Sequence, residues 1–178
     1  MSKTVLLIID VQKALVEANP YNKEAFLTNL KTLLSLARQN KIEPIFVQHN
    51  GRAGTELEYG SKGWGIAAEI APTKEEVAIS KEKNSAFKDT NLHAYLQGKG
   101  VTALILAGMQ TEYCVDATCK SAFDLGYAIL IPRGCTTTFD NEYFLGRDLS
   151  QYYENKIWHN RFAQVGSIED AIKGSVNG

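Results

Sequence analysis

The sequence predicts an α/β protein: a three-layer α/β/α sandwich of the Rossmann type around a mainly parallel sheet of about six strands. Two observations lead to this class. Short apolar runs alternate with longer segments of helical periodicity. Two of the runs, VLLII and ALILA, contain no polar residue, as is typical of strands buried on both faces. Because each intervening helix returns the chain to the same edge, strands that alternate with helices form a parallel sheet.

The first half of the chain contains two predicted strands, one long helix and one long loop. Residues 4–10 (TVLLIID) form a continuous apolar run and are predicted to be the first strand. Residues 23–40 are predicted to form a helix, because their apolar residues recur at helical spacing. Residues 42–48 (IEPIFVQ) are the second strand. Residues 49–65 are rich in glycine and polar residues and predict a long loop, a feature that is often functional in compact domains.

The middle of the chain repeats the strand and helix alternation. Residues 76–80 (EVAIS) predict a short third strand, and residues 91–100 (NLHAYLQGKG) predict a helix that glycine stops. Residues 101–108 (VTALILAG) are the clearest strand in the sequence. Residues 111–125 are predicted to form the next helix, which Gly126 closes.

The last part of the chain completes the sheet. Residues 127–132 (YAILIP) and 162–166 (FAQVG) are the fifth and sixth predicted strands. Residues 167–174 (SIEDAIKG) predict a final helix with Ser167 as its N-cap. Since no repeat, low-complexity segment or linker interrupts the pattern, residues 1–178 are predicted to form a single domain.

Composition excludes several classes of function. The chain has 178 residues, of which 44% are hydrophobic and 22% are charged, which suits one globular domain with a substantial core. The net charge of −1 gives no basic field for nucleic acid, and the apolar runs are too short to span a bilayer. The N-terminal segment is interpreted as a strand and not as a signal peptide. Three cysteines without a CxxC pair predict a reducing, cytoplasmic setting.

Groups suited to catalysis follow the predicted strands, and in parallel sheets the chemistry gathers at the carboxyl ends of strands. Three of these ends offer a carboxylate (Asp10), an amine (Lys81 or Lys83) and a thiol (Cys114). A helix N-terminus and a nearby ammonium group both lower the pKa of a thiol. A carboxylate can take the thiol proton and return it to a leaving group. The set therefore favours a thiol nucleophile that works without histidine.

Each member of this set also has a structural interpretation. Asp10 could cap a turn, Lys81 could belong to a solvated loop, and Cys114 could be a core residue. From composition and spacing alone, an enzyme is favoured only slightly over a small-molecule-binding protein of the same fold. A redox protein is disfavoured, because the spacing of Cys114 and Cys119 turns their side chains about 140° apart on an ideal helix.

Several segments together resemble the isochorismatase-like cysteine hydrolases. They are LLIIDVQ at 6–12, ISKEKNSAF at 79–87, DTNLHAYL at 89–96, LILAGMQTEYCVDAT at 104–118 and SAFDLGYAILIP at 121–132. Their order and spacing over nearly the whole chain resemble this superfamily without pointing to one substrate. The resemblance implies the same α/β/α fold that the periodicity predicts.

The resemblance also implies a catalytic triad. Asp10 matches the family aspartate of the D-x-Q segment, and Cys114 matches the nucleophile of the G-x-x-T-x-x-C-V segment. Lys81 matches the family lysine, which stands four residues before SAF, whereas Lys83 does not fit that spacing. We therefore expect Lys81 to hold the charges while Asp10 transfers protons.

A backbone feature accompanies the triad in this family. A non-proline cis peptide bond precedes the nucleophile segment and corresponds by position to Met109–Gln110. The resemblance implies that this bond turns the backbone amides of Gln110 and Cys114 toward a developing oxyanion. Stabilisation of that kind is what acyl transfer requires.

The sequence departs from one branch of the family. The nicotinamidase branch has a metal site of one aspartate and two histidines after the second strand, whereas the segment QHNGRAGTELEYGSKGW has His49 alone and no Asp-x-His pattern. We therefore expect no catalytic metal and no cofactor.

The cysteine favours hydrolysis of an amide-type carbon–nitrogen bond of a small molecule. The alternative is a non-catalytic, small-molecule-binding or inactive member of the same fold.

The resemblance also suggests where substrate and other subunits bind. We expect a small-molecule substrate, no nucleic-acid or membrane partner, and assembly into a homo-oligomer, a dimer or a tetramer. The expected substrate contacts are polar or aromatic residues near the strand ends: Gln12, His49, Trp64, Phe87 and Tyr113.

Overall fold

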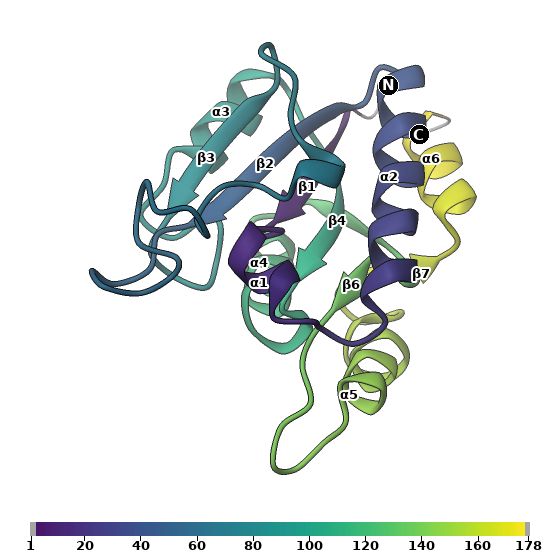
Figure 1. The fold of residues 1–178 in the computed structure, drawn as a ribbon. Coiled ribbons are helices and arrows are strands. Elements are labelled where there is room, and N and C mark those ends of the chain that lie inside the picture. The colour runs from purple at the N-terminus through teal and green to yellow at the C-terminus, as the bar shows by residue number, and fades with distance from the viewer. Residues whose placement is uncertain (1–2, 177–178) are drawn as a thin grey trace.

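The protein is built around one seven-stranded sheet, as a computed structural model that describes residues 3–176 shows (Figure 1). The strand order is β3–β2–β1–β4–β5–β7, and the short β6 pairs with β4. Every pair of neighbouring strands in the described sheet is parallel, so the predicted fold class is confirmed. The strands are β1 (Thr4–Ile9), β2 (Glu43–His49), β3 (Val77–Lys81), β4 (Ala103–Met109), β5 (Ala128–Pro132), β6 (Thr136–Thr137) and β7 (Gln164–Gly166).

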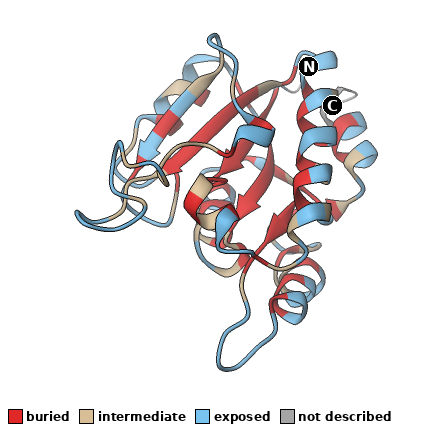
Figure 2. Ribbon diagram, viewed as in Figure 1, coloured by how far each residue is buried: buried red, intermediate tan, exposed pale blue. Residues whose placement is uncertain are grey.

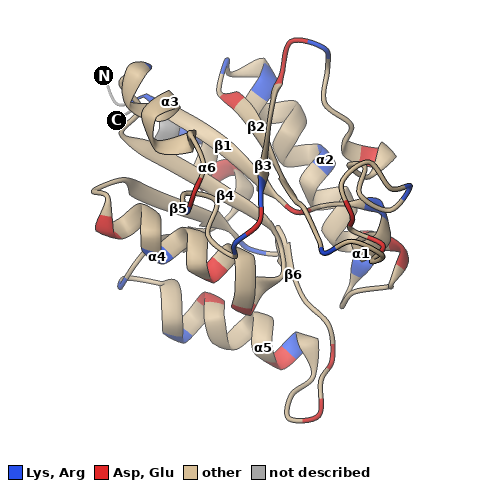
Figure 3. Ribbon diagram, turned by 90° about the vertical axis from the view of Figure 1, so that its left-hand side faces the viewer, with Lys and Arg blue, Asp and Glu red and all other residues tan. Residues whose placement is uncertain are grey.

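Helices cover both faces of the sheet in two views at right angles (Figures 1 and 3), and every residue of β1 is buried (Figure 2). Leu6 and Ile8 join an apolar cluster with helices α2 (Lys23–Gln39) and α6 (Ile168–Val176). Val5, Leu7 and Ile9 point the other way, because side chains alternate along a strand, and join a cluster with α3 (Leu92–Gly98) and α4 (Asp116–Asp124). No helix of the described chain is both long and apolar enough to cross a membrane.

Several short elements were not predicted from the sequence. They are α1 (Lys13–Glu17), β6, a 3₁₀ turn (Ala68–Ile70), α5 (Gly146–Tyr152) and a π-helical segment (Tyr153–Trp158). The helix predicted for 111–125 instead begins as a π-helical turn (Thr111–Val115) and continues as α4. Elements this short carry little periodicity, so tertiary contacts determine them.

The predicted long loop packs closely against α1. The backbone N–H of Lys13 donates to the Gly65 carbonyl at 2.8 Å, and that of Ala14 donates to the Gly63 carbonyl at 3.0 Å. A Cβ atom at Gly63 would lie 2.5 Å from the Glu56 carbonyl oxygen and 2.7 Å from the Ala14 Cβ. Only glycine allows this approach, which fixes the loop beside the carboxyl end of β1.

Gly108 is predicted to be indispensable for the pairing of β1 with β4. Its φ is +128°, and a Cβ at this position would lie 2.0 Å from the Ile9 carbonyl oxygen of the paired strand. We expect Gly108→Ala to lower the free energy of unfolding by about 3 kcal/mol or more. The matched control is Gly98→Ala at the end of α3, where a Cβ meets nothing within 4 Å. This control is expected to change stability by no more than about 1 kcal/mol. Urea unfolding followed by circular dichroism measures both, and equal effects would contradict the prediction.

Candidate active site

Four polar side chains meet because neighbouring parallel strands end at the same edge of the sheet. Asp10 follows β1, His49 ends β2, Lys81 ends β3, and Cys114 lies in the turn after β4. The register pairs His49 with Lys81, and the backbone N–H of Asp10 donates to the Val47 carbonyl at 2.9 Å. The sheet order β3–β2–β1–β4 therefore determines which of these residues are neighbours.

The Lys81 ammonium group is the centre of the cluster. Its Nζ lies 2.7 Å from Asp10 Oδ2, 3.2 Å from Cys114 Sγ and 3.3 Å from His49 Nδ1. Since β2 lies between β3 and β1, the side chain must cross one strand spacing before it reaches Asp10. The long lysine stem makes this possible, and the whole side chain is buried, with a relative exposure of 0%. The choice of Lys81 over Lys83 agrees with this geometry, because Lys83 is exposed.

Burial determines the protonation of the acid and the thiol. It raises the pKa of Asp10, against the opposing effect of the Lys81 charge. Burial, and then the Asp10 charge, raise the pKa of Cys114 to about 12. The sequence predicts a lowered thiol pKa, and this prediction is wrong. In the structure the ammonium does lower it, but by less than burial raises it. The resting cysteine is therefore a thiol and not a thiolate.

The Asp10 carboxylate has room for a second proton donor. Oδ2 accepts the hydrogen bond from Lys81, whereas Oδ1 is buried without a hydrogen-bond partner of normal geometry among the described residues. The Cys114 thiol is close enough to lower the pKa of Asp10 as a hydrogen-bond donor. A thiol proton can therefore pass to a carboxylate that is already next to it.

His49 is held as a neutral imidazole with a defined tautomer. Burial, and then the Lys81 charge, lower its pKa. Because an ammonium group can only donate, Nδ1 is the acceptor and the ring proton is on Nε2. The Gln12 side chain fixes the backbone of His49: its Oε1 accepts from the His49 N–H at 2.9 Å, and its Nε2 donates to the carbonyl at 3.1 Å.

The cluster opens into a cavity of about 380 Å³, which we call the catalytic cavity. Its walls are Asp10, Leu15, His49, Leu57, Asn84, Met109, Gln110, Tyr113 and Cys114. The peptide bond between Met109 and Gln110 is cis, at the position that the family resemblance indicates. Of the predicted substrate contacts, the structure brings His49 and Tyr113 into this wall. Tyr113 is 51% exposed at the mouth.

The other three predicted contacts lie elsewhere. Gln12 is fully buried and its amide bridges backbone groups of His49 and Trp64. The Trp64 ring packs edge-on to Tyr59, and its Nε1 donates to Asn50 Oδ1 at 2.8 Å. These two residues position the loop around His49.

Phe87 is not one of the residues that line the catalytic cavity. Its ring stacks on Tyr127 at 5.9 Å between centroids and meets His93 edge-on. It therefore packs against α3 and the start of β5. The sequence alone does not distinguish this packed position of Phe87 from a position in the cleft. In both arrangements the segment that contains Phe87 follows Lys81 closely along the chain.

The site contains residues that the sequence did not indicate as contacts. Leu15 and Leu57 are apolar walls from α1 and the long loop, and Asn84 follows Lys81 on an exposed segment. Among the described residues, no group of three or more His, Cys, Asp or Glu side chains could hold a metal ion. His49 Nδ1 faces an ammonium group, so this residue does not fit a metal site through that nitrogen.

Comparisons with protein families and with solved structures agree on one family. The family model described as the isochorismatase domain matches residues 4–170. Among solved structures, an isochorismatase family protein has a TM-score of 0.86 at 34% sequence identity, and the match covers 93% of this chain and 98% of that chain.

Two relatives of similar sequence identity differ in activity, since one is named as a hydrolase and the other as a probable inactive enzyme. A streptothricin hydrolase of Streptomyces noursei is 32% identical over 137 residues, which is 76% of this chain and 50% of that protein. A probable inactive nicotinamidase of Arabidopsis thaliana is 32% identical over 146 residues, which is 70% of this chain and 74% of that protein. The chain therefore spans about half the length of the streptothricin hydrolase that it matches.

The lowered pKa of His49 predicts a pH-dependent contribution to stability. The unfolded chain binds a proton at His49 as the pH falls below about 6.5, whereas the folded protein resists it. This contribution is fully present above that pH and is lost as the pH falls toward the lower folded pKa. We expect His49→Gln to remove it. Urea unfolding between about pH 5 and pH 8 compares the two proteins, with the remaining histidines cancelling in the difference. Parallel stability curves would show that His49 is not held neutral.

Proposed function

The chain belongs to the isochorismatase family, and we propose that it is a cysteine hydrolase that cleaves an amide-type carbon–nitrogen bond of a small molecule. The observation that carries this proposal is the contact of one buried ammonium group, Lys81 Nζ, with both Asp10 Oδ2 and Cys114 Sγ. A nucleophile, a proton acceptor and a fixed positive charge are thus within hydrogen-bond reach of one another.

The first step proposed is attack by Cys114 on the substrate carbonyl. Because the resting group is a thiol, deprotonation accompanies the attack and does not precede it. Asp10 accepts the proton as the carbon–sulfur bond forms. The Lys81 ammonium stays charged beside both groups and limits the cost of moving negative charge between them.

The oxyanion that forms needs donors that are already oriented. We propose the backbone amides of Gln110 and Cys114 for this role, since both residues line the catalytic cavity beside the sulfur atom. The His49 Nε2–H provides a further donor on the wall of the same cavity. A substrate therefore needs an acceptor atom, and not a donor, opposite His49.

The second half of the reaction reuses the same acid and base. Asp10 returns its proton to the departing nitrogen, and the amine or ammonia leaves while Cys114 holds the acyl group as a thioester. Water then loses a proton to Asp10 and attacks the thioester, which releases the acid and restores the thiol. We propose that no metal or cofactor takes part, because every step has a protein group to perform it.

Two substitutions test this mechanism. We expect Cys114→Ala and Asp10→Asn each to lower kcat/KM for an amide substrate by about 10³-fold or more, because each removes a group that forms or breaks a bond. Ammonia or amine release from a panel of small amides provides the measurement.

Wild type should also accumulate an acyl adduct on Cys114 that intact-mass spectrometry detects and hydroxylamine removes.

The control is Asp124→Asn, which changes an exposed carboxylate of α4. It should keep wild-type kinetics, and urea unfolding should show that Cys114→Ala remains folded. Full turnover by Cys114→Ala would contradict the proposed mechanism. If the panel gives neither turnover nor an adduct, the non-catalytic alternative becomes the better account.

A further inference from the structure

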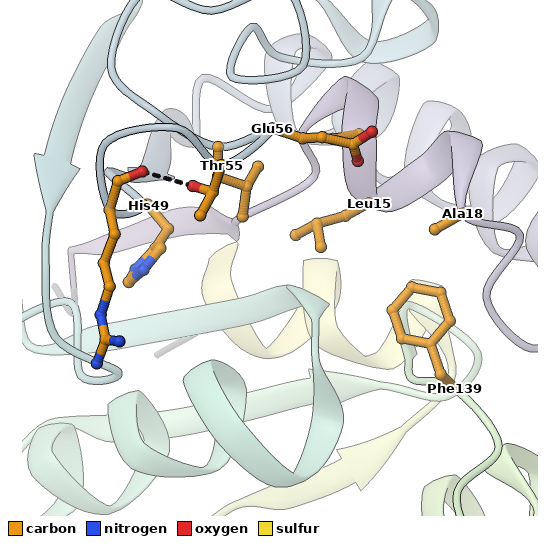
Figure 4. Close-up of a pocket in the computed structure, with 10 residues that line it drawn as sticks. Leu15, Ala18, His49, Thr55, Glu56 and Phe139 are labelled. Atoms are coloured by element: carbon orange, nitrogen blue, oxygen red, sulfur yellow. Dashed lines mark hydrogen bonds between the residues drawn. The ribbon is translucent and has the colours of Figure 1, made fainter.

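A second cavity of about 520 Å³ adjoins the catalytic cavity. The two share Leu15, His49 and Leu57 in their walls, so the second cavity lies directly beside the first at the histidine. We call it the side chamber. It is lined by Ala14, Leu15, Ala18, His49, Gly51, Arg52, Thr55, Glu56, Leu57 and Phe139. In Figure 4, Leu15 and Ala18 lie at the α1 side, Phe139 lies across from them, and His49 and Thr55 lie toward the opposite end.

One wall of the side chamber is a loop with its own hydrogen bonds. The Gly51 N–H donates to the Leu57 carbonyl at 2.7 Å, and Thr55 Oγ1 donates to the Arg52 carbonyl at 2.7 Å. The Gly54 N–H donates to Glu58 Oε2 at 2.8 Å. Together with the close approach at Gly63, these bonds place the loop at a fixed separation from α1. The chamber is therefore formed before any ligand binds.

The walls of the side chamber are mostly apolar. Ala14, Leu15 and Ala18 contribute from α1 and its C-terminal end, while Leu57 and Phe139 line other parts of the open chamber. The charged residues, Arg52 and Glu56, have opposite signs and are exposed. Their charges cancel, so the chamber offers no net charge to a ligand. Apolar concave surface of this kind beside reactive groups is typical of a binding site for an uncharged, apolar group.

We propose that the side chamber binds the non-reacting part of the substrate. The substrate class is then an amide that carries an uncharged hydrocarbon group, such as a ring, which extends from the carbonyl at Cys114 past His49. This inference rests on the proposed function for the position of the carbonyl. It adds that selectivity comes from α1, the long loop and Phe139, and not from the residues around the sulfur atom.

Covalent probes test the chamber without knowledge of the natural substrate. Chloroacetamide and N-phenethyl chloroacetamide both alkylate a cysteine: the sulfur–carbon bond forms, chloride leaves, and the thiol proton passes to Asp10 and then to solvent. The second-order rate of labelling at Cys114 is measured by mass spectrometry for each probe. We expect the phenethyl probe to react roughly tenfold faster, the gain expected from burying one aromatic ring.

A variant that fills the chamber separates this effect from general hydrophobicity. Ala18 is exposed at the end of α1 and lines the chamber. In Ala18→Trp the ratio of the two labelling rates should fall close to one. The neighbouring Glu17→Trp adds the same side chain at an exposed position outside the chamber wall and should keep the wild-type ratio. A third probe carries a carboxylate on its ring. It should label Cys114 no faster than the uncharged phenethyl probe does.

The outcomes distinguish this inference from the proposed function. Equal rates for the two probes in wild type, or the same ratio in both tryptophan variants, would overturn the side-chamber assignment while leaving Cys114 as a nucleophile. A carboxylate probe that reacts fastest, and loses its advantage in Arg52→Gln, would overturn the uncharged substrate class. If no probe labels native Cys114 although all of them label the unfolded chain, it is the proposed function that fails.

Discussion

The rest of the site depends on the buried ion pair between the Lys81 ammonium group and the Asp10 carboxylate. A charge with no exposed surface is tolerated only when it is paired and hydrogen-bonded, and Asp10 and His49 provide those partners. These two contacts and the one with Cys114 hold the ends of β1, β2 and β3 together with the turn that carries Cys114. Removing either Lys81 or Asp10 would leave an unpaired charge in the core, so the geometry and the chemistry of the site are coupled.

Burial keeps both the thiol of Cys114 and the imidazole of His49 uncharged. It raises the pKa of the Cys114 thiol and lowers that of the His49 imidazole, so the first stays protonated and the second stays neutral in the resting protein. A cysteine held as a thiol is less exposed to adventitious oxidation than a free thiolate. The arrangement therefore favours a nucleophile that becomes active with substrate in place. Leu15 and Leu57 add apolar walls to the cavity that contains the sulfur atom.

The predictable part of the molecule consists of features that are local in sequence. The long apolar strands and the helix at 23–40 follow from periodicity, and their boundaries agree with the structure within about two residues. Asp10, Lys81 and Cys114 could be selected because strand ends of a parallel sheet converge and because their segments match a family in order. Helix α1, the π-helical turn and the positions of Trp64 and Phe87 could not be predicted, since packing between distant segments decides each of them.

The sequence by itself determined the sheet and its layers and indicated the candidate reactive groups, because hydrophobic periodicity and short motifs are local properties of the chain. Only the tertiary structure decided how those groups behave. The raised pKa of Cys114 depends on how deeply the turn is buried, and the tautomer of His49 depends on which atom lies 3.3 Å from its Nδ1. The side chamber likewise exists because the loop, α1 and Phe139 meet in space. Burial and distance between residues far apart in sequence are properties that no local pattern encodes.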